Sequence, residues 1–94
     1  MASPIQQYFQ FVLNQVTELA STITQQMDHI DTMPENLRHP FYEDLVLTYY
    51  PRVARQMLIA LQCDEEEIRE QLIYEFESIT DDLNEAYEMI NPSE

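Results

Sequence analysis

The side chains best suited to metal chemistry lie between residues 28 and 39. They are Asp28, His29, Asp31, Glu35 and His39. Carboxylate oxygens and imidazole nitrogens suit a transition-metal ion. Their spacing matches no compact site, however, because a calcium loop needs a glycine that the chain lacks and a di-iron centre needs histidine three residues after glutamate. We therefore expect no metal and no cofactor, and interpret these residues as polar loop and capping groups.

The single cysteine, Cys63, is the only thiol nucleophile. The carboxylates of Asp64, Glu65 and Glu66 oppose thiolate formation, although the positive end of a following helix would favour it. The other carboxylates are expected on a solvated face without a pocket for proton transfer. We therefore predict that the chain is not an enzyme. One cysteine also excludes an internal disulfide and is typical of a reducing compartment, so we expect a cytoplasmic protein.

The acidic side chains are concentrated in the last third of the chain. Residues 64–94 hold twelve of them and one base, Arg69, and so carry −11 of the net charge of −14. With four arginines and no lysine, the chain should be repelled by nucleic acid and by anionic membranes. No apolar run approaches the roughly 18 residues of a membrane span, and we expect no secretory leader. This charge favours a basic protein surface as partner.

Size and composition predict one small helical domain over residues 1–94. Hydrophobic residues make up 45% of the chain, which is too many for a disordered acidic tail. The absence of glycine excludes the tight turns of hairpins and phosphate-binding loops. The spacing of apolar residues predicts an all-α protein, an up-down-up three-helix bundle whose second helix is kinked or broken.

The first predicted helix covers about residues 4–30. Ser3 is placed to cap its N-terminus, and Pro4 suits its first position. Apolar side chains then recur at three- and four-residue steps within about 120° of arc, as in a helix that packs one face on a core. They are Ile5, Phe9, Val12, Leu13, Val16, Leu19, Ala20, Ile23, Met27 and Ile30. Residues 31–39 should form a loop with one short helical turn at 34–38.

The second predicted helix covers about residues 40–62. It should begin at Pro40, because His39 precedes a proline and is biased away from helical geometry. Its apolar side chains span around 220°, so two of its sides should be covered, by the other two helices or by a second subunit. Pro51 lacks an N–H and crowds the carbonyl of Leu47, which predicts a kink near Pro51 or a break that would make four helices.

The third predicted helix covers about residues 64–90, with Asp64 as its N-cap and Glu67 completing a capping box. A link of only about two residues makes it antiparallel to the second helix. Its predicted core residues are Ile68, Leu72, Phe76, Ile79, Leu83, Ala86 and Ile90. The opposite face carries what we call the acidic stripe: Glu66, Glu70, Glu77, Asp81 and Glu88, flanked by Glu67 and Glu85. We expect Arg52 and Arg55 of the second helix to pair with acids of its neighbours.

The acidic stripe is compatible with three interpretations. Its internal repulsion costs about 1–2.5 kcal/mol at low salt, which burial of the core residues outweighs, so it could be a solvated face only. It could instead dock a basic protein surface. It could also mimic a nucleic-acid backbone, since Glu66 and Glu88 lie about 33 Å apart along a helix. Duplex DNA would present about twenty charges over that length, so this mimic would be dilute.

Two aromatic residues stand out on the predicted surface. Tyr74 points into the acidic stripe and could be a rigid anchor. Phe11 lies on the outer face of the first helix among amides, a composition that interface cores favour. The leading hypothesis is a non-catalytic regulator or adaptor that docks a basic protein surface through the third helix. The predicted contact residues are Glu70, Tyr74, Glu77, Asp81, Glu85, Glu88 and Phe11.

Two alternative functions remain open at this point. The chain could be a structural or assembly protein, a homodimer built on the Phe11 face of the first helix and the apolar surplus of the second. It could also inhibit a DNA-binding protein as a nucleic-acid mimic, if dimerisation doubled the charge.

Overall fold

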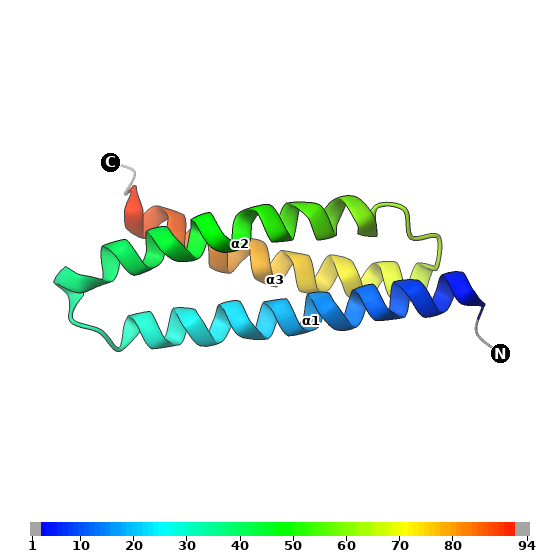
Figure 1. Cartoon of the computed structure of the whole chain (residues 1–94), viewed down its shortest axis with the longest axis horizontal. Helices are drawn as coiled ribbons and strands as arrows, with labels where there is room; N and C mark the ends of the chain where they lie inside the picture. Colours follow the sequence, from blue (N-terminus) through cyan, green and yellow to red (C-terminus); the bar gives the residue numbers. More distant parts are fainter. Residues whose placement is uncertain (1–2, 92–94) are drawn as a thin grey trace.

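Three long helices form an antiparallel bundle in the computed structural model, which describes residues 3–91. The helices are α1 (Pro4–Asp31), α2 (Arg38–Ala60) and α3 (Glu66–Ile90), and a 3-10 turn, η1 (Glu35–Leu37), joins α1 to α2. Successive helices run in opposite directions along a body of 53 × 24 × 17 Å (Figure 1). The predicted all-α, up-down-up three-helix bundle is confirmed. Within the described residues, no helix is long and apolar enough to cross a membrane.

The N-terminus of α1 is capped as predicted. The hydroxyl of Ser3 accepts a hydrogen bond from the Gln6 N–H at 3.1 Å, and the Gln6 side-chain oxygen accepts one from the Ser3 N–H at 3.0 Å. This reciprocal capping box, followed by Pro4 at the first helical position, satisfies donors that would otherwise lack a partner. The predicted core stripe of α1 is buried except for Ile5, which is exposed, and Leu19, which is half-buried.

The start of α2 differs from the prediction. The helix begins at Arg38 rather than Pro40, so His39 is helical although it precedes a proline. Pro40 falls in the first turn, where a missing N–H costs little because no helical acceptor exists for it. The guanidinium of Arg38 also donates to the carbonyl oxygens of Asp31 (2.9 Å) and Met33 (2.8 Å), which holds the turn against the end of α1.

The predicted break at Pro51 is wrong. Within the described residues, α2 continues through Pro51 to Ala60, and no fourth long helix forms. Tyr49 and Val53, on either side of the proline, are both buried in the core, so their packing holds the helix together despite one lost hydrogen bond. The kink near Pro51 stays a prediction.

The link between α2 and α3 is longer than predicted. It covers residues 61–65, and α3 begins at Glu66 with Glu65 as an N-cap whose side chain makes no capping hydrogen bond. The predicted Asp64 capping box is therefore wrong. The physical reason is Cys63, which turns into the core, is 2% exposed, and donates its S–H to the Glu65 carbonyl at 3.6 Å. No residue from 3 to 91 has a positive φ, so none of these turns requires glycine.

The core lies along the bundle axis, where one stripe from each helix meets. The largest fully buried side chains are those of Val16, Ile23, Leu45, Leu72 and Ile79. The predicted α3 stripe is confirmed, with Ile68 and Ile90 half-buried at its ends. The buried stripe of α2 is narrower than its apolar face. It consists of Tyr42, Leu45, Tyr49, Val53 and Ala60.

Candidate functional site

The acidic stripe of α3 is exposed along its whole length, and the fold itself does not neutralise it. Among residues 3–91 the one ion pair is between His39 Nδ1 and Glu43, at 4.0 Å, and no arginine pairs with a carboxylate. The predicted pairing of Arg52 and Arg55 with neighbouring acids is therefore wrong for this range. Arg52 instead lies over the ring of Tyr49, 5.7 Å from its centroid. The negative charge of the stripe is left for solvent, salt or a partner.

The predicted contact residues lie on two different sides of α3. Phe11 lines a shallow hollow with the start of α3, near Glu67. Tyr74 and Glu70 line another hollow between α3 and α1. The side chains of Glu77 and Asp81 line a hollow on the opposite side, between α3 and α2. Glu85 and Glu88 are exposed. The fold therefore brings Glu77 and Asp81 together beside α2, and separates them from Phe11 and Tyr74.

One side of α2 remains uncovered although it is apolar. We predicted that two sides of the second helix would be covered, by the other two helices or by a second subunit. Within the single chain, α1 and α3 cover only one side of α2. Coverage of the other side by a second subunit stays a prediction. The uncovered residues recur at three- and four-residue steps and form what we call the second apolar stripe. They are Leu47, Tyr50, Ala54, Met57, Leu58 and Leu61, with exposed fractions from 43% for Met57 to 79% for Leu61 among the large side chains.

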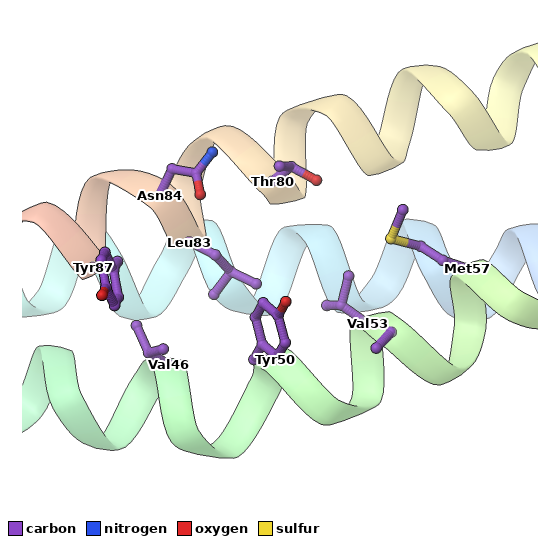
Figure 2. Close-up of a pocket in the computed structure, with 9 residues that line it drawn as sticks. Val46, Tyr50, Val53, Met57, Thr80, Leu83, Asn84 and Tyr87 are labelled. Atoms are coloured by element: carbon purple, nitrogen blue, oxygen red, sulfur yellow. The ribbon is translucent and has the colours of Figure 1, made fainter.

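The second apolar stripe borders a groove between α2 and α3, which we call the α2/α3 groove. It consists of two adjoining hollows of about 420 and 510 Å³ that share Met57 and Thr80. Figure 2 shows the first hollow, with Tyr50 of α2 beside Leu83 of α3 and Val46 of α2 beside Tyr87 of α3. The second hollow continues the groove toward the α2–α3 link. From Val46 to Leu61 the groove is about 22 Å long along α2.

The floor and the edges of the groove differ in chemistry. Its floor consists of core side chains such as Val53, Leu72 and Leu83. Its edges carry five exposed large apolar side chains, which we call the apolar rim: Tyr50, Met57, Leu61, Ile73 and Tyr87. Glu77 and Asp81 line the α3 edge as well, with Arg69 nearer the α2–α3 link, whereas no charged residue of α2 lines the groove. The site is an apolar channel whose α3 edge carries two carboxylates and one guanidinium.

Polar contacts cross the seams that α1 makes with the other two helices. The hydroxyl of Thr24 in α1 donates to the Asp82 carboxylate in α3 at 3.0 Å. The side-chain amide of Gln26 donates to the hydroxyl of Tyr49 in α2 at 2.8 Å. Each contact joins α1 to one of the other two helices.

A third polar contact perturbs a titratable group. The hydroxyl of Tyr42 donates to the carboxylate of Asp31. Burial raises the pKa of Tyr42 from 10.0 to about 12. The hydrogen bond to Asp31 and the negative charges of Asp31 and Glu85 also raise this pKa, whereas the positive charge of Arg38 lowers it. Because the phenol is neutral at physiological pH, it acts here as a hydrogen-bond donor that ties α2 to the end of α1.

Two of the candidate metal ligands in the 28–39 segment contact other helices at helix ends. Between residues 3 and 91, no group of three or more His, Cys, Asp or Glu side chains is placed to hold a metal ion. Asp31 is engaged by Tyr42, and Nε2 of His39 lies 3.2 Å from the carbonyl oxygen of Ile90 at the end of α3. Asp28, His29 and Glu35 are exposed. These contacts fit the interpretation of the segment as loop and capping groups.

Sequence reasoning assigned the apolar surplus of the second helix only to a homodimer, and it did not identify the apolar rim that α2 shares with α3. The apolar side chains of the second helix span about 220° of arc, which indicated an uncovered apolar side. The arc alone does not show which part of it a neighbouring helix covers. No known protein family, curated protein or solved structure matches the chain. Its function must therefore be inferred from this surface.

Proposed function

We propose that this chain is a non-catalytic regulator or adaptor that binds a basic surface of another protein through α3. The observation that supports this most is the acidic stripe, which is exposed and makes no ion pair with an arginine of the described residues. A partner that brings lysine or arginine side chains to the stripe gains Coulomb attraction and also relieves repulsion within α3.

Charge alone would give a weak complex. An exposed ion pair is worth at most about 1 kcal/mol, and salt screens it over about 8 Å at physiological ionic strength. The acidic stripe would therefore speed and orient the encounter. The affinity would come from apolar anchors, and Glu77 and Asp81 directly border such a set in the α2/α3 groove.

One observation favours a second candidate, the homodimer. The second apolar stripe of α2 could be covered by the same stripe of another copy. Each copy, however, carries a net charge of −14, and a dimer through this side would bring two acidic α3 edges close together. Light scattering decides between the two, since the proposed adaptor is a monomer by itself and a homodimer is not.

Charge reversal of the stripe tests the proposal. We expect the triple variant Glu77→Lys, Asp81→Lys, Glu85→Lys to recover at least about tenfold less of the partner from an extract of the native host at low salt. The matched control is Glu18→Lys, Asp28→Lys, Glu35→Lys, which changes the net charge equally at exposed positions outside α3. Unchanged recovery with the α3 variant, or equal losses in both variants, contradicts the proposal.

A further inference from the structure

We infer that the α2/α3 groove binds one amphipathic helix of the partner protein, with apolar residues against the apolar rim and lysine or arginine along the edge that meets Glu77 and Asp81. The bound helix would be the fourth helix of the bundle. This inference rests on the proposed function, because it specifies the form in which the partner presents its basic groups.

The shape of the groove fits a helix. Two antiparallel helices wall the groove over about 22 Å, which is the length of about four helical turns. A helix laid between two others packs its side chains into the space above their contact, at an interaxial distance of about 8–10 Å. The floor already consists of apolar core residues, so such a helix would extend the existing core outward.

The spacing of the exposed residues also fits a helix. On α2, Tyr50, Ala54, Met57 and Leu61 follow steps of four, three and four residues, which is the repeat of a helix–helix seam. On α3, Ile73, Thr80 and Tyr87 are spaced by seven residues and face the same hollows. These two rows of residues line the same groove. A helix bound there would therefore need apolar residues at three- and four-residue spacing to contact both rows.

The charge of the groove selects a basic partner. Glu77 and Asp81 line the α3 edge, and Arg69 lies on the same edge nearer the α2–α3 link, so the edge keeps a net negative charge. The α2 edge has no charged lining residue. The bound helix should therefore carry its cations along one side of its apolar stripe, and not along both. A second copy of this chain fits poorly, because its four arginines and complete lack of lysine cannot supply such a row.

Matched peptides test the inference on the full chain. The probe is a synthetic helical peptide of about 18 residues, long enough for the four turns of the groove, with leucines at a three- and four-residue spacing and lysines along one edge. A shuffled peptide of the same composition has no apolar stripe, and a third peptide has glutamate in place of lysine. We expect the first to bind at least about tenfold more tightly than either control, by fluorescence anisotropy.

Variants on the rim locate the binding site. We expect Tyr50→Glu and Ile73→Glu to weaken peptide binding by about tenfold or more, because each places a charge in the apolar channel. Both side chains are at least half exposed, at 64% and 50%, so circular dichroism should show an intact helical fold. The matched control is Ile5→Glu, the same change as at Ile73 but at a residue of α1 that is 65% exposed and does not line the groove, and it should leave binding unchanged.

The outcomes separate this inference from the proposed function. Equal binding of the shuffled peptide, no binding of the first peptide, or no effect of the two rim variants overturns the helix-in-groove inference. The proposed function survives those results if the Glu77, Asp81 and Glu85 reversals still abolish partner recovery. If sedimentation shows a wild-type dimer that Tyr50→Glu converts to a monomer, a second copy occupies the groove, and the inference is overturned in favour of a homodimer.

Discussion

The two flanks of α3 have similar residue types but different arrangements. On the α1 flank, Thr24 and Asp82 join the helices, and the exposed aromatic residues Phe11 and Tyr74 lie in separate hollows among polar groups. On the α2 flank, the five exposed large side chains of the apolar rim line two adjoining hollows, with Met57 shared by both and Tyr87 at one end. Isolated exposed apolar residues are ordinary, whereas a contiguous set beside charge is typical of an interface.

This difference shows that the role of an acidic residue on α3 depends on which flank of the helix it occupies, and not on the number of acids. Asp81 and Asp82 are neighbours in sequence, yet Asp82 accepts a hydrogen bond from α1 and Asp81 lines the α2/α3 groove. The Asp82 carboxylate contributes to the fold, whereas the Asp81 carboxylate remains exposed at the groove. A count of charges cannot distinguish the two.

The largest expected effect is on the free energy of unfolding, and two isoleucines of α3 compare the core with the apolar rim. Ile79 is fully buried, and its replacement by alanine should lower the free energy of unfolding by about 2–5 kcal/mol. Ile73→Ala, at a half-exposed residue of the rim, should cost less than about 1 kcal/mol. Urea denaturation of the free protein measures both. Similar losses in the two variants would mean that the rim is already covered in the free protein, and the two flanks would no longer differ.

The next effect concerns the contact between Tyr42 of α2 and Asp31 at the end of α1, and it depends on pH. Because the fold raises the pKa of Tyr42 from 10.0 to about 12, the neutral phenol contributes stability that is fully present below pH 10 and is lost as pH rises through 12. We expect the free energy of unfolding to fall by about 2–3 kcal/mol over this range.

Tyr42→Phe is the control for this pH dependence. The variant should be somewhat less stable at neutral pH, because Asp31 loses its hydrogen-bond donor, and its stability should fall less steeply above pH 10. Chemical denaturation at several pH values measures the difference between the two proteins. Identical slopes would show that the contact between α2 and the end of α1 does not protect the phenol.

A smaller effect compares the adjacent acids directly. Asp82→Ala should be less stable than Asp81→Ala by about 1 kcal/mol, because only the first loses the hydrogen bond from Thr24. Both replacements remove one charge and gain the same helix propensity, but Asp81→Ala also relieves repulsion from Glu77 and Glu85. At high salt this repulsion is screened, so the remaining difference reports the contact with α1. Thermal unfolding of the two variants measures it. If Asp81→Ala is the less stable variant, the assignment of the two acids to different roles is wrong.

The smallest effect tests the repulsion along the groove edge. Asp81 has acidic neighbours four residues away on each side, Glu77 and Glu85, so Asp81→Asn should stabilise the free protein by about 0.4–1 kcal/mol at low salt. The gain should disappear at high salt, where the charges are screened. A gain that persists at high salt would indicate a cause other than charge, and the acidic edge would then store no repulsion for a partner to relieve.

Much of the fold could be predicted because amphipathic periodicity depends on local sequence. The stripes of α1 and α3 are buried almost as predicted, and Ser3 caps α1 through a purely local contact. The ends of the other helices depend on tertiary packing. His39 is helical where Arg38 holds the preceding turn, and Cys63 draws the link into the core at the expense of a cap by Asp64.

The candidate site was predicted only in part, for a related reason. The spacing of Glu77 and Asp81 places them on the outer face of α3, which could be read from the sequence. The groove beside them depends on how α2 is rotated about its own axis. Leu45 is buried while Leu47 is exposed. Both lie within the roughly 220° apolar arc of the helix, so the sequence does not indicate which of them faces the core.

The chain contains no glycine, and no backbone angle between residues 3 and 91 requires one. This composition lowers the conformational entropy of the unfolded chain as well as shaping the turns. A glycine gives the denatured ensemble extra backbone freedom that folding must remove, and its replacement where the native angles allow typically stabilises a protein by about 0.4–1 kcal/mol. The turns around Pro34 and Cys63 therefore lose less conformational entropy on folding than glycine-bearing turns of the same length. For a bundle of 94 residues that leaves part of its apolar surface uncovered, this saving in entropy helps the free protein to remain folded.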